Sequence, residues 1–527
     1  MVTGLLSRLL PRRQQTARIA AFGGGYDGAS LRGSMRTFLA RAGGPRADSI
    51  PSLPGLRGRS RDLERNNPLA TGTLATVTTN VVGTGIFPMP RLDPVRLGIS
   101  AERAAEVELA LGAEFDLWAD VPTADDSYEQ DFWGLQELAL RSQLLSGDVF
   151  SVPRYERRGQ SPYELAVQMI EADRCCNPPG RSDGSVMPSG AELVAGVEVD
   201  QRGRALAYWF ADRHPGEVLH RSLRFERLPA WGPNGNRAVF HHFRRQRPGQ
   251  TRGIPYFAPV IALFKDLGRY TEAEITAAVL SACFALTTTD EAGDGADVHG
   301  VGDAGTSGDG PDVSDRLRSF EPGLTGNLAP GQQIASFMPN RPNQAFDPFV
   351  LAMLRQIGVA LEIPYEVLIK HFTASYSAAR AALLEAWKMF RARRAWLAAS
   401  FCQPYYERLL TEASAIGRPG IPDVFGNYGR FRAWSACEWI GPSPGQIDEM
   451  KEAEAAKLRV DEGFSTREEE TARLTGGDWR QKHRQRVIEE RLRSQDLPSA
   501  VAVTKPATPP SPIDDPTQDQ PDREDAA

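Results

Sequence analysis

Apolar residues recur at helical spacing through residues 61–146 of the chain. In the run RDLERNNPLATGTLATVTTNVV, a pair of asparagines ending at Asn67 suits an N-cap, and Pro68 suits the first turn of the helix that follows. The same spacing predicts helices over residues 101–118 and 130–146. The first part of the chain is therefore predicted to be helical.

Short runs rich in β-branched and aromatic residues come next, separated by turn residues. They read VFSVPRYE, ELAVQMIEA, ELVAGVEVD and ALAYWFADR. The stretch GVEVDQRGRALAYWF predicts a β-hairpin that turns between Asp200 and Gly203. Together with the helices, these strands predict an α+β body over residues 120–250.

Helical spacing returns at Pro259 and continues to about Thr287. At 1.5 Å per residue this predicts a helix of roughly 40 Å. Glycine and aspartate then dominate residues 288–316, which hold too few apolar side chains to form a core, so we expect a disordered loop. The spacing of a calcium-binding loop is absent from it, which argues against a calcium site.

Two helices then flank a polar loop. The first is predicted to be capped by Asp347 and to end before Pro364, because proline disfavours helical geometry in the residue that precedes it. The second is basic and is predicted to run from Ser377 to Gln403. The loop between them carries Lys370, His371, Thr373, Ser375 and Tyr376. These residues suggest no catalytic scheme, but they suit a loop held against something that slides past it.

The C-terminal part is predicted to be helical up to about residue 496. The residues from Ser465 to Glu468 match a capping box, and Asp478 suits the cap of the next helix. Proline and acidic residues dominate residues 497–527, which indicates a disordered tail.

The charge and the cysteine content limit the classes of function that the chain can have. The 527 residues include 61 Lys or Arg and 67 Asp or Glu, so the formal charge is 61 − 67 = −6. This balance argues against a protein that grips nucleic acid over its whole surface. The five cysteines form no CxxC pair, which indicates reduced, intracellular thiols. Residues 1–55 read as a flexible basic arm whose apolar run is too short for a signal peptide, and no segment suits a membrane span.

Candidate catalytic and metal-binding residues are few. His241 and His242 are adjacent, so their side chains would diverge on a strand, and no third ligand stands at a known spacing. We interpret them as surface or hairpin residues. The chain contains no HExxH, GxSxG or phosphate-loop pattern. We therefore expect no catalytic residue, no metal site and no cofactor.

One arginine cluster permits two interpretations. The stretch HHFRRQRPGQTRG holds Arg244, Arg245, Arg247 and Arg252 near Phe243. Such a cluster suits nucleic-acid binding, and it equally suits a solvated loop that pairs with acidic neighbours. The sequence leaves both interpretations open.

The stretch RPGQTRGIPYFAPVIALFKDLGRYTEAE, from Arg247 to Glu274, resembles the central signature of the lambda-like family of tailed-phage portal proteins. Further resemblances follow in the family's order. NNPLATGTLATVTTNVVGTGI is similar to its N-terminal helix, and QMIEADRCCNP and GVEVDQRGRALAYWF to its wing strands. LAPGQQI is similar to a proline-glycine turn, and YSAAR to its YSSAR motif, with Ala378 in place of a serine. The resemblance covers roughly residues 60–495.

The resemblance implies an α+β portal fold and a ring oligomer. Its parts would be the N-terminal arm at 1–55, the wing at 56–254, a stem helix at 255–287, the clip with its Gly/Asp-rich insertion at 288–345, a second stem helix and tunnel loop at 346–376, wing and crown helices at 377–496, and the acidic tail at 497–527.

The same resemblance implies a DNA channel at one vertex of a phage capsid, in a ring usually of twelve subunits. The channel would serve genome packaging, head–tail joining and DNA ejection. The implied partners are double-stranded DNA without sequence preference, the terminase large subunit, the major capsid or scaffold protein, and head–tail connector proteins. The protein would lie in the virion, and in the bacterial host cytoplasm during assembly.

The resemblance also implies site residues. The polar loop from Lys370 to Tyr376 would be the tunnel loop that touches DNA. Candidate contacts with DNA or a partner are Arg244, Arg245, Arg247, Arg252, Arg380, Lys388 and Arg391. Two other functions remain to be distinguished from a portal: a phage-encoded hydrolase, and a monomeric nucleic-acid-binding adaptor that uses the patch from Arg244 to Arg252.

Overall fold

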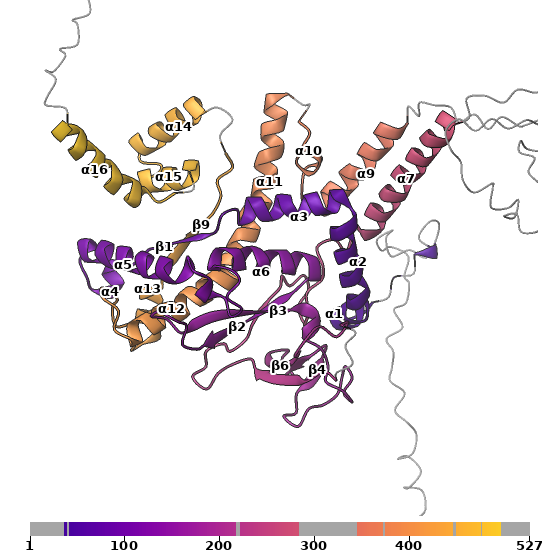
Figure 1. Ribbon diagram of the computed structural model, residues 1–527, viewed down its shortest axis with the longest axis horizontal. Helices are drawn as coiled ribbons and strands as arrows, with labels where there is room; N and C mark the ends of the chain where they lie inside the picture. The colour runs from indigo at the N-terminus through magenta and orange to yellow at the C-terminus, as the bar shows by residue number, and fades with distance from the viewer. Residues whose placement is uncertain are drawn as a thin grey trace, which may run out of the picture.

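A computed structural model describes residues 36–38, 40, 42–217, 222–283, 345–372, 375–445, 449–475 and 477–496. The predicted loop at 288–316 and the predicted tail from residue 497 lie outside these residues. Figure 1 shows a body of helices and sheets from which pairs of helices project, with a further group of helices set apart near the C-terminal end. Within the described ranges, no helix combines the length and the apolar character that a membrane crossing requires.

The N-terminal helices begin earlier than the sequence indicated. Helices α1 (Pro45–Ser49) and α2 (Leu53–Asn66) precede α3 (Pro68–Val81). The prediction of a flexible arm was therefore wrong for residues 45–55, because Leu53 and Arg57 are buried against the body. The predicted cap is confirmed: the side chain of Asn67 accepts hydrogen bonds from the backbone N–H groups of Leu69 and Ala70.

Helices α5 (Ala101–Ala119) and α6 (Phe132–Ser146) agree with the predicted ranges. Ser100 caps α5, and Asp131 caps α6 through the N–H of Gly134. Both helices contribute to one large core that also contains α3 and the bases of the projecting helices. Aromatic rings fill its centre, including Phe115, Trp118, Phe132 and Phe401.

Three antiparallel sheets complete the body, and the predicted hairpin around Asp200 is confirmed. The first sheet has the order β3 (Leu165–Glu171), β2 (Val149–Tyr155), β8 (Phe240–His242). The second has the order β4 (Glu192–Val194), β5 (Val197–Val199), β6 (Ala205–Ala211), β7 (Phe225–Pro229). The third pairs β1 (Phe87–Pro90) with β9 (Cys437–Ile440), and so joins two segments that lie far apart in the sequence.

Two pairs of helices rise from this body (Figure 1). The first is α7 (Ile261–Cys283) with α9 (Phe346–Ala360), and the second is α10 (Tyr365–Ile369) with α11 (Tyr376–Leu397). Helix α9 begins one residue before Asp347, so the predicted Asp347 cap was wrong. Asp347 instead lies in the first helical turn, where its negative charge interacts favourably with the unpaired backbone N–H groups.

The helix that starts at α11 does not end at Gln403, and that prediction was wrong. A π-helical turn, Ala398–Cys402, connects α11 directly to α12 (Gln403–Ala415). In a regular α-helix the ring of Pro404 would clash with the carbonyl of the residue four positions earlier. The wider π turn relieves this conflict, so the chain continues as a bent helix.

The remaining helices are α4 (Pro94–Leu97), α13 (Tyr428–Trp434), α14 (Glu449–Asp461), α15 (Arg467–Thr475) and α16 (Trp479–Asp496). The capping box of α15 lies one residue later than predicted. Thr466 Oγ1 accepts a hydrogen bond from the N–H of Glu469, whose carboxylate accepts one from the N–H of Thr466. Asp478 caps α16 as predicted, through the N–H of Arg480.

Candidate functional site

The pair of helices α7 and α9 is anchored at its base and held together further out. Phe264 of α7 and Leu354 of α9 are buried in the main core. Beyond them, the ring of Tyr270 stacks on Phe346 with centroids 5.6 Å apart. These contacts make the pair a single projecting arm rather than two separate helices (Figure 1).

This arm exposes apolar side chains. Ile275 and Val279 of α7 are 60% and 56% exposed, and Val359 of α9 is 82% exposed. Helix α7 therefore has a buried base around Phe264 and an uncovered outer part. Exposed apolar residues on a projecting element indicate a contact with another protein surface.

The polar loop follows α10 and places two basic side chains in solvent. Lys370 adopts a left-handed conformation with φ of 56°, which ends α10, and Lys370 and His371 are both exposed. Ser375 lies within hydrogen-bond distance of Ser377, with 3.2 Å between the two Oγ atoms. Thr373 lies outside the described residues, and Tyr376 is described only as the first residue of α11.

The basic side chains of α11 divide into surface residues and structural ones. Arg380 pairs with Glu452 at 3.6 Å, Lys388 pairs with Glu385 at 2.5 Å, and Arg391 is exposed. In contrast, Arg394 donates to the carbonyl oxygens of Asn80 and Val81 at the end of α3. The candidate contacts Arg380, Lys388 and Arg391 therefore remain on the surface.

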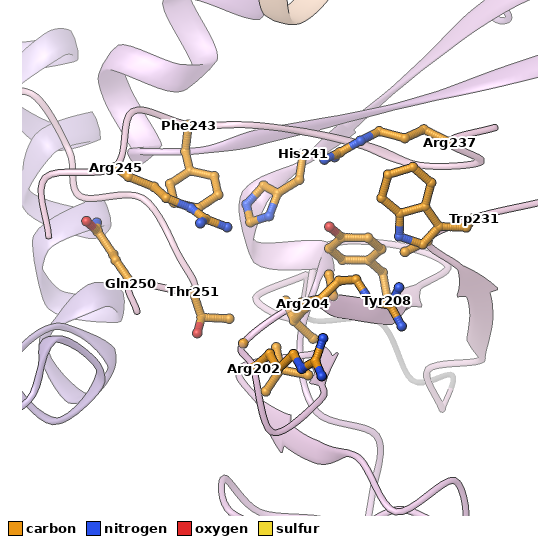
Figure 2. A pocket seen from close by; sticks show the side chains of 15 residues that line it. Arg202, Arg204, Tyr208, Trp231, Arg237, His241, Phe243, Arg245, Gln250 and Thr251 are labelled. Carbon is orange, nitrogen blue, oxygen red and sulfur yellow. The ribbon is translucent and has the colours of Figure 1, made fainter. Parts of the chain in front are cut away.

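The arginine cluster after β8 does not form one patch. Arg252 is fully buried, so the prediction that it contacts DNA or a partner was wrong. Arg247 is exposed but pairs with Asp48 at 2.7 Å. Arg245 lies over the ring of Phe243 and lines a cavity of about 510 Å³ (Figure 2). Arg244 is exposed and does not line this cavity.

Arg252 belongs to a buried ionic cluster centred on Asp148. Asp148 Oδ2 accepts from Arg252 Nε at 2.6 Å, and Asp148 Oδ1 accepts from Arg57 Nη2 at 2.8 Å. Burial alone would raise the pKa of Asp148, but the charges of Arg252 and Arg57 outweigh it and hold the pKa well below its usual value. The remaining guanidinium donors of Arg252 bind the backbone carbonyl oxygens of Ala172, Cys175 and Ala195. The cluster therefore joins α2, the start of β2 and the segment before α7.

The two adjacent histidines are buried, so their interpretation as surface residues was wrong. Their side chains diverge as predicted. His241 donates toward Asp148 at 3.0 Å, and His242 Nε2 lies 2.7 Å from Ser151 Oγ. Burial lowers the pKa of His241 to about 4 despite the nearby Asp148, and lowers the pKa of His242 to about 3. Both rings are neutral at pH 7, and they serve the packing of β8.

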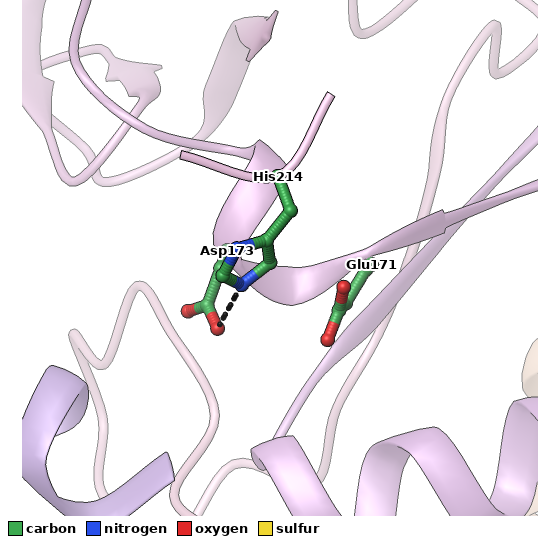
Figure 3. Close-up of side chains that lie close together, drawn as sticks. All are labelled: Glu171, Asp173 and His214. Carbon is green, nitrogen blue, oxygen red and sulfur yellow. Dashed lines mark hydrogen bonds and ion pairs between the residues drawn. The ribbon is translucent and has the colours of Figure 1, made fainter. Parts of the chain in front are cut away.

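Glu171, Asp173 and His214 come together at the edge of the first sheet (Figure 3). His214 Nε2 lies 3.3 Å from Asp173 Oδ2. However, Arg61 pairs with Glu171 at 2.7 Å and with Asp173 at 2.5 Å, and Arg57 pairs with Asp173 at 2.8 Å. Both carboxylates are already neutralised by guanidinium groups, so we interpret this group as an ion-pair cluster.

Sequence reasoning missed Asp148, which organises the region around the arginine segment. An aspartate between Gly147 and a strand looks like a turn residue, and its partners lie about 90 to 105 positions away along the chain. The only signal was the arginine in the TRG segment, and it has no spacing that identifies an aspartate partner. A contact between residues so far apart in the sequence can be identified only from the folded structure.

Comparisons with known proteins agree on one family. The model for "Phage portal protein, lambda family" matches residues 32–394. Portal protein B of Escherichia phage lambda is 24% identical over 491 residues, covering 89% of each chain. The portal protein of Escherichia phage N15 is 24% identical over 488 residues, again covering 89% of each chain. A chain in the neck of a native GTA particle is 14% identical, with a TM-score of 0.37, and covers 84% of this chain and 97% of that one.

Proposed function

Because this chain belongs to the lambda family of phage portal proteins, we propose that it forms the ring-shaped DNA channel at the portal vertex of a phage capsid. The family match carries this proposal, since residues 32–394 include the body, the arm of α7 and α9, the polar loop and the start of α11. The channel serves genome packaging, head–tail joining and DNA ejection. The chain has no catalytic role in this proposal, and a partner supplies the energy for packaging.

The parts of the fold take their roles from this assignment. The body up to residue 254 is the wing, and α7 with α9 is the stem. Residues 288–345 are the clip, which faces the terminase. The polar loop around Lys370 is the tunnel loop, and the helices from residue 377 to 496 contribute to the wing and crown. The exposed apolar residues of the stem support this division, because in a ring they would meet a neighbouring subunit.

The tunnel loop supplies weak contact with DNA. A conduit must touch DNA without retaining it, and each lysine that neutralises a phosphate adds salt-dependent affinity. Twelve chains of formal charge −6 would together carry 12 × (−6) = −72, so the ring as a whole would not adhere to DNA. A ring of exposed Lys370 and His371 side chains would provide local contact without sequence preference.

Ring assembly is tested by the mass of the purified protein in solution. We expect a mass near 12 × 57.7 kDa, about 690 kDa, and images of rings with a central hole. Ile275→Asp combined with Val279→Asp should shift the mass toward 57.7 kDa, because charge on the stem opposes subunit contact. Val95→Asp is the matched control, since Val95 is 91% exposed on α4, away from the stem. Equal assembly of the stem variant and the control would contradict a stem interface.

The tunnel-loop assignment needs a separate experiment. Lys370→Ala with His371→Ala should lower DNA retention in packaged particles while leaving ring mass unchanged. Lys457→Ala is the control, since it removes an exposed lysine from α14 rather than from the loop. Normal packaging and retention in the loop variant would overturn the assignment.

The remaining partners follow from the same proposal. The ring would dock the terminase large subunit, contact the major capsid or scaffold protein, and later bind head–tail connector proteins. It would assemble in the host cytoplasm. The monomeric adaptor is not favoured, because Arg252 is buried, Arg247 is paired, and the patch on which that function depended is divided.

A further inference from the structure

A cavity on the second sheet combines arginine and aromatic side chains. Its volume is about 510 Å³, and Figure 2 shows its polar and aromatic residues around one space. Arg202 and Arg204 come from the β5–β6 hairpin turn, Arg237 comes from the segment before β8, and Arg245 from the segment after it. Four cations from three segments thus line one cavity together with Tyr208.

Positive charge in this cavity is largely uncompensated. Its lining residues include no aspartate or glutamate. Arg204 pairs with Asp200 at 3.3 Å, whereas within the described ranges Arg202, Arg237 and Arg245 form no ion pair with a carboxylate. Arg237 instead lies over the ring of Trp231 at 4.8 Å, and Arg245 over Phe243 at 5.6 Å. Such pre-positioned guanidinium groups suit bidentate binding of carboxylates.

The position of the cavity favours a protein ligand over the genome. It lies on the sheet of β4 to β7, whereas the helices assigned to the DNA channel project from the other side of the body (Figure 1). A ligand at this sheet would therefore be separated from DNA in the channel. An acidic peptide suits this cavity, because carboxylates pair with guanidinium groups and proline rings pack on aromatic faces.

The chain itself contains a segment of this chemistry. Residues 497–527 hold six acidic residues against Lys505 and Arg523, and they hold seven prolines. The acidic residues are Asp514, Asp515, Asp519, Asp522, Glu524 and Asp525. The acidic residues lie 514 − 496 = 18 to 525 − 496 = 29 positions beyond Asp496, the last described residue. At about 3.3 Å per extended residue they can lie roughly 60 to 95 Å from it, which is comparable to the diameter of a folded unit of this size.

We propose that the acidic, proline-rich segment of residues 506–527 docks in the cavity lined by Arg202, Arg237, Arg245 and Trp231. Aspartate carboxylates pair with the free guanidinium groups, and prolines pack on the aromatic rings. While the segment is docked, an acidic partner must compete with it for the cavity. The preference for a peptide over DNA rests on the proposed channel, whereas the docking itself does not require ring assembly.

Competition binding with full-length chains tests this docking. A fluorescent peptide of residues 506–527 is titrated against the natural chain and against a chain with Asp514, Asp515, Asp519 and Asp522 changed to Asn. The neutralised chain should bind the peptide at least about tenfold more tightly, because its own segment no longer occupies the cavity. Adding Arg202→Ala and Arg237→Ala to that chain should abolish binding, whereas Arg65→Ala with Arg181→Ala, which removes two exposed arginines elsewhere, should not.

Three results would overturn the proposal. One is failure of the neutralised chain to bind the peptide, with its fold verified by circular dichroism. Another is equal binding after Arg202 and Arg237 are removed, which would place the peptide elsewhere. The third is displacement of the peptide by an oligonucleotide of equal charge at lower concentration than by unlabelled peptide, which would make the cavity a nucleic-acid site. Loss of ring assembly in the variants of the stem would leave this test unaffected.

Discussion

Asp148 is the residue on which a buried ionic cluster beside the first sheet converges. It is fully buried, and it accepts hydrogen bonds from Arg57, Arg252, His241 and the backbone N–H of Gly253. A buried ion pair adds little net stability when intact, because desolvation offsets the attraction between the charges. Removing one partner is far more costly, because the other charge stays buried without compensation. The cluster therefore makes the stability of the body sensitive to single substitutions.

Arg252→Ala should destabilise the fold strongly. The substitution leaves Asp148 with one guanidinium fewer and removes a hydrogen-bond donor from three backbone carbonyl oxygens. We expect the free energy of unfolding to fall by about 3–5 kcal/mol, measured by urea denaturation. Arg245→Ala is the matched control from the same segment, and as an exposed residue it should change stability by less than about 0.5 kcal/mol. Similar losses of unfolding free energy in the two variants would contradict a special contribution of the buried Arg252 to stability.

The buried histidines should make the protein acid-sensitive. Burial lowers the pKa of His242 to about 3, whereas the unfolded chain titrates near about 6.5. Between these values the unfolded state binds the extra proton, so stability is complete above about pH 6.5 and declines as the pH falls toward 3. Each titrating histidine contributes a slope of about 1.4 kcal/mol per pH unit. His242→Gln should reduce the slope of the unfolding free energy against pH by about 1.4 kcal/mol per pH unit, which corresponds to one proton. An unchanged slope would contradict the low pKa of His242.

At the scale of elements, the connection before α7 depends on two glycines in contact. Gly147 ends α6 with φ of 88°, and a side chain at Gly253 would place its Cβ 1.9 Å from the carbonyl oxygen of Gly147. Neither backbone segment can move, because Asp148 and Arg252 on either side are fixed in the ionic cluster. This contact explains why the sequence carries glycine directly after Arg252.

Gly253→Ala should therefore lower stability by about 3 kcal/mol or more, through overpacking against backbone. Gly72→Ala is the matched control. Gly72 lies inside α3 with open space where its Cβ would go, so alanine there should raise stability by about 0.5–1 kcal/mol. Thermal unfolding measures both. A stable Gly253→Ala variant would mean that the two segments separate more easily than their contacts indicate.

Local signals predicted most elements of this fold. Asn67 and Asp478 cap helices through their own side chains, and the Asp200 turn connects β5 to β6, because these structures depend on residues a few positions apart. The features that the sequence did not predict depend on packing between residues far apart in the chain. Pro404 reads as a helix end, yet burial of Phe401 and Tyr405 in the main core keeps the helix continuous through a π turn. Arg252 reads as a surface arginine, and only the folded chain brings Asp148 to it.

At the scale of the whole molecule, helices α14 to α16 are a group tied to the body mainly by ion pairs (Figure 1). Arg91, beside β1, pairs with Glu468 of α15 at 2.6 Å. Arg480 of α16 pairs with Glu108 of α5 and lies 3.5 Å from Glu468. A cavity of about 460 Å³ lies at the same junction, lined by apolar residues such as Phe87 and Trp133 and by Glu108 and Arg480. An attachment made by ion pairs is sensitive to salt and to the loss of a single charge.

Salt and a single substitution should therefore release this group. Exposed and partly exposed ion pairs weaken as ionic strength rises, whereas apolar contacts do not. We expect limited thermolysin digestion between β9 and α14 to accelerate several-fold in 1 M NaCl, because a loss of about 1 kcal/mol raises the open population roughly fivefold. Arg480→Ala should produce the same acceleration at low salt, while Arg486→Ala, an exposed arginine of the same helix, should not. Cleavage rates that change neither in 1 M NaCl nor in the Arg480→Ala variant would contradict this prediction. They would mean that contacts other than these ion pairs hold the helices in place.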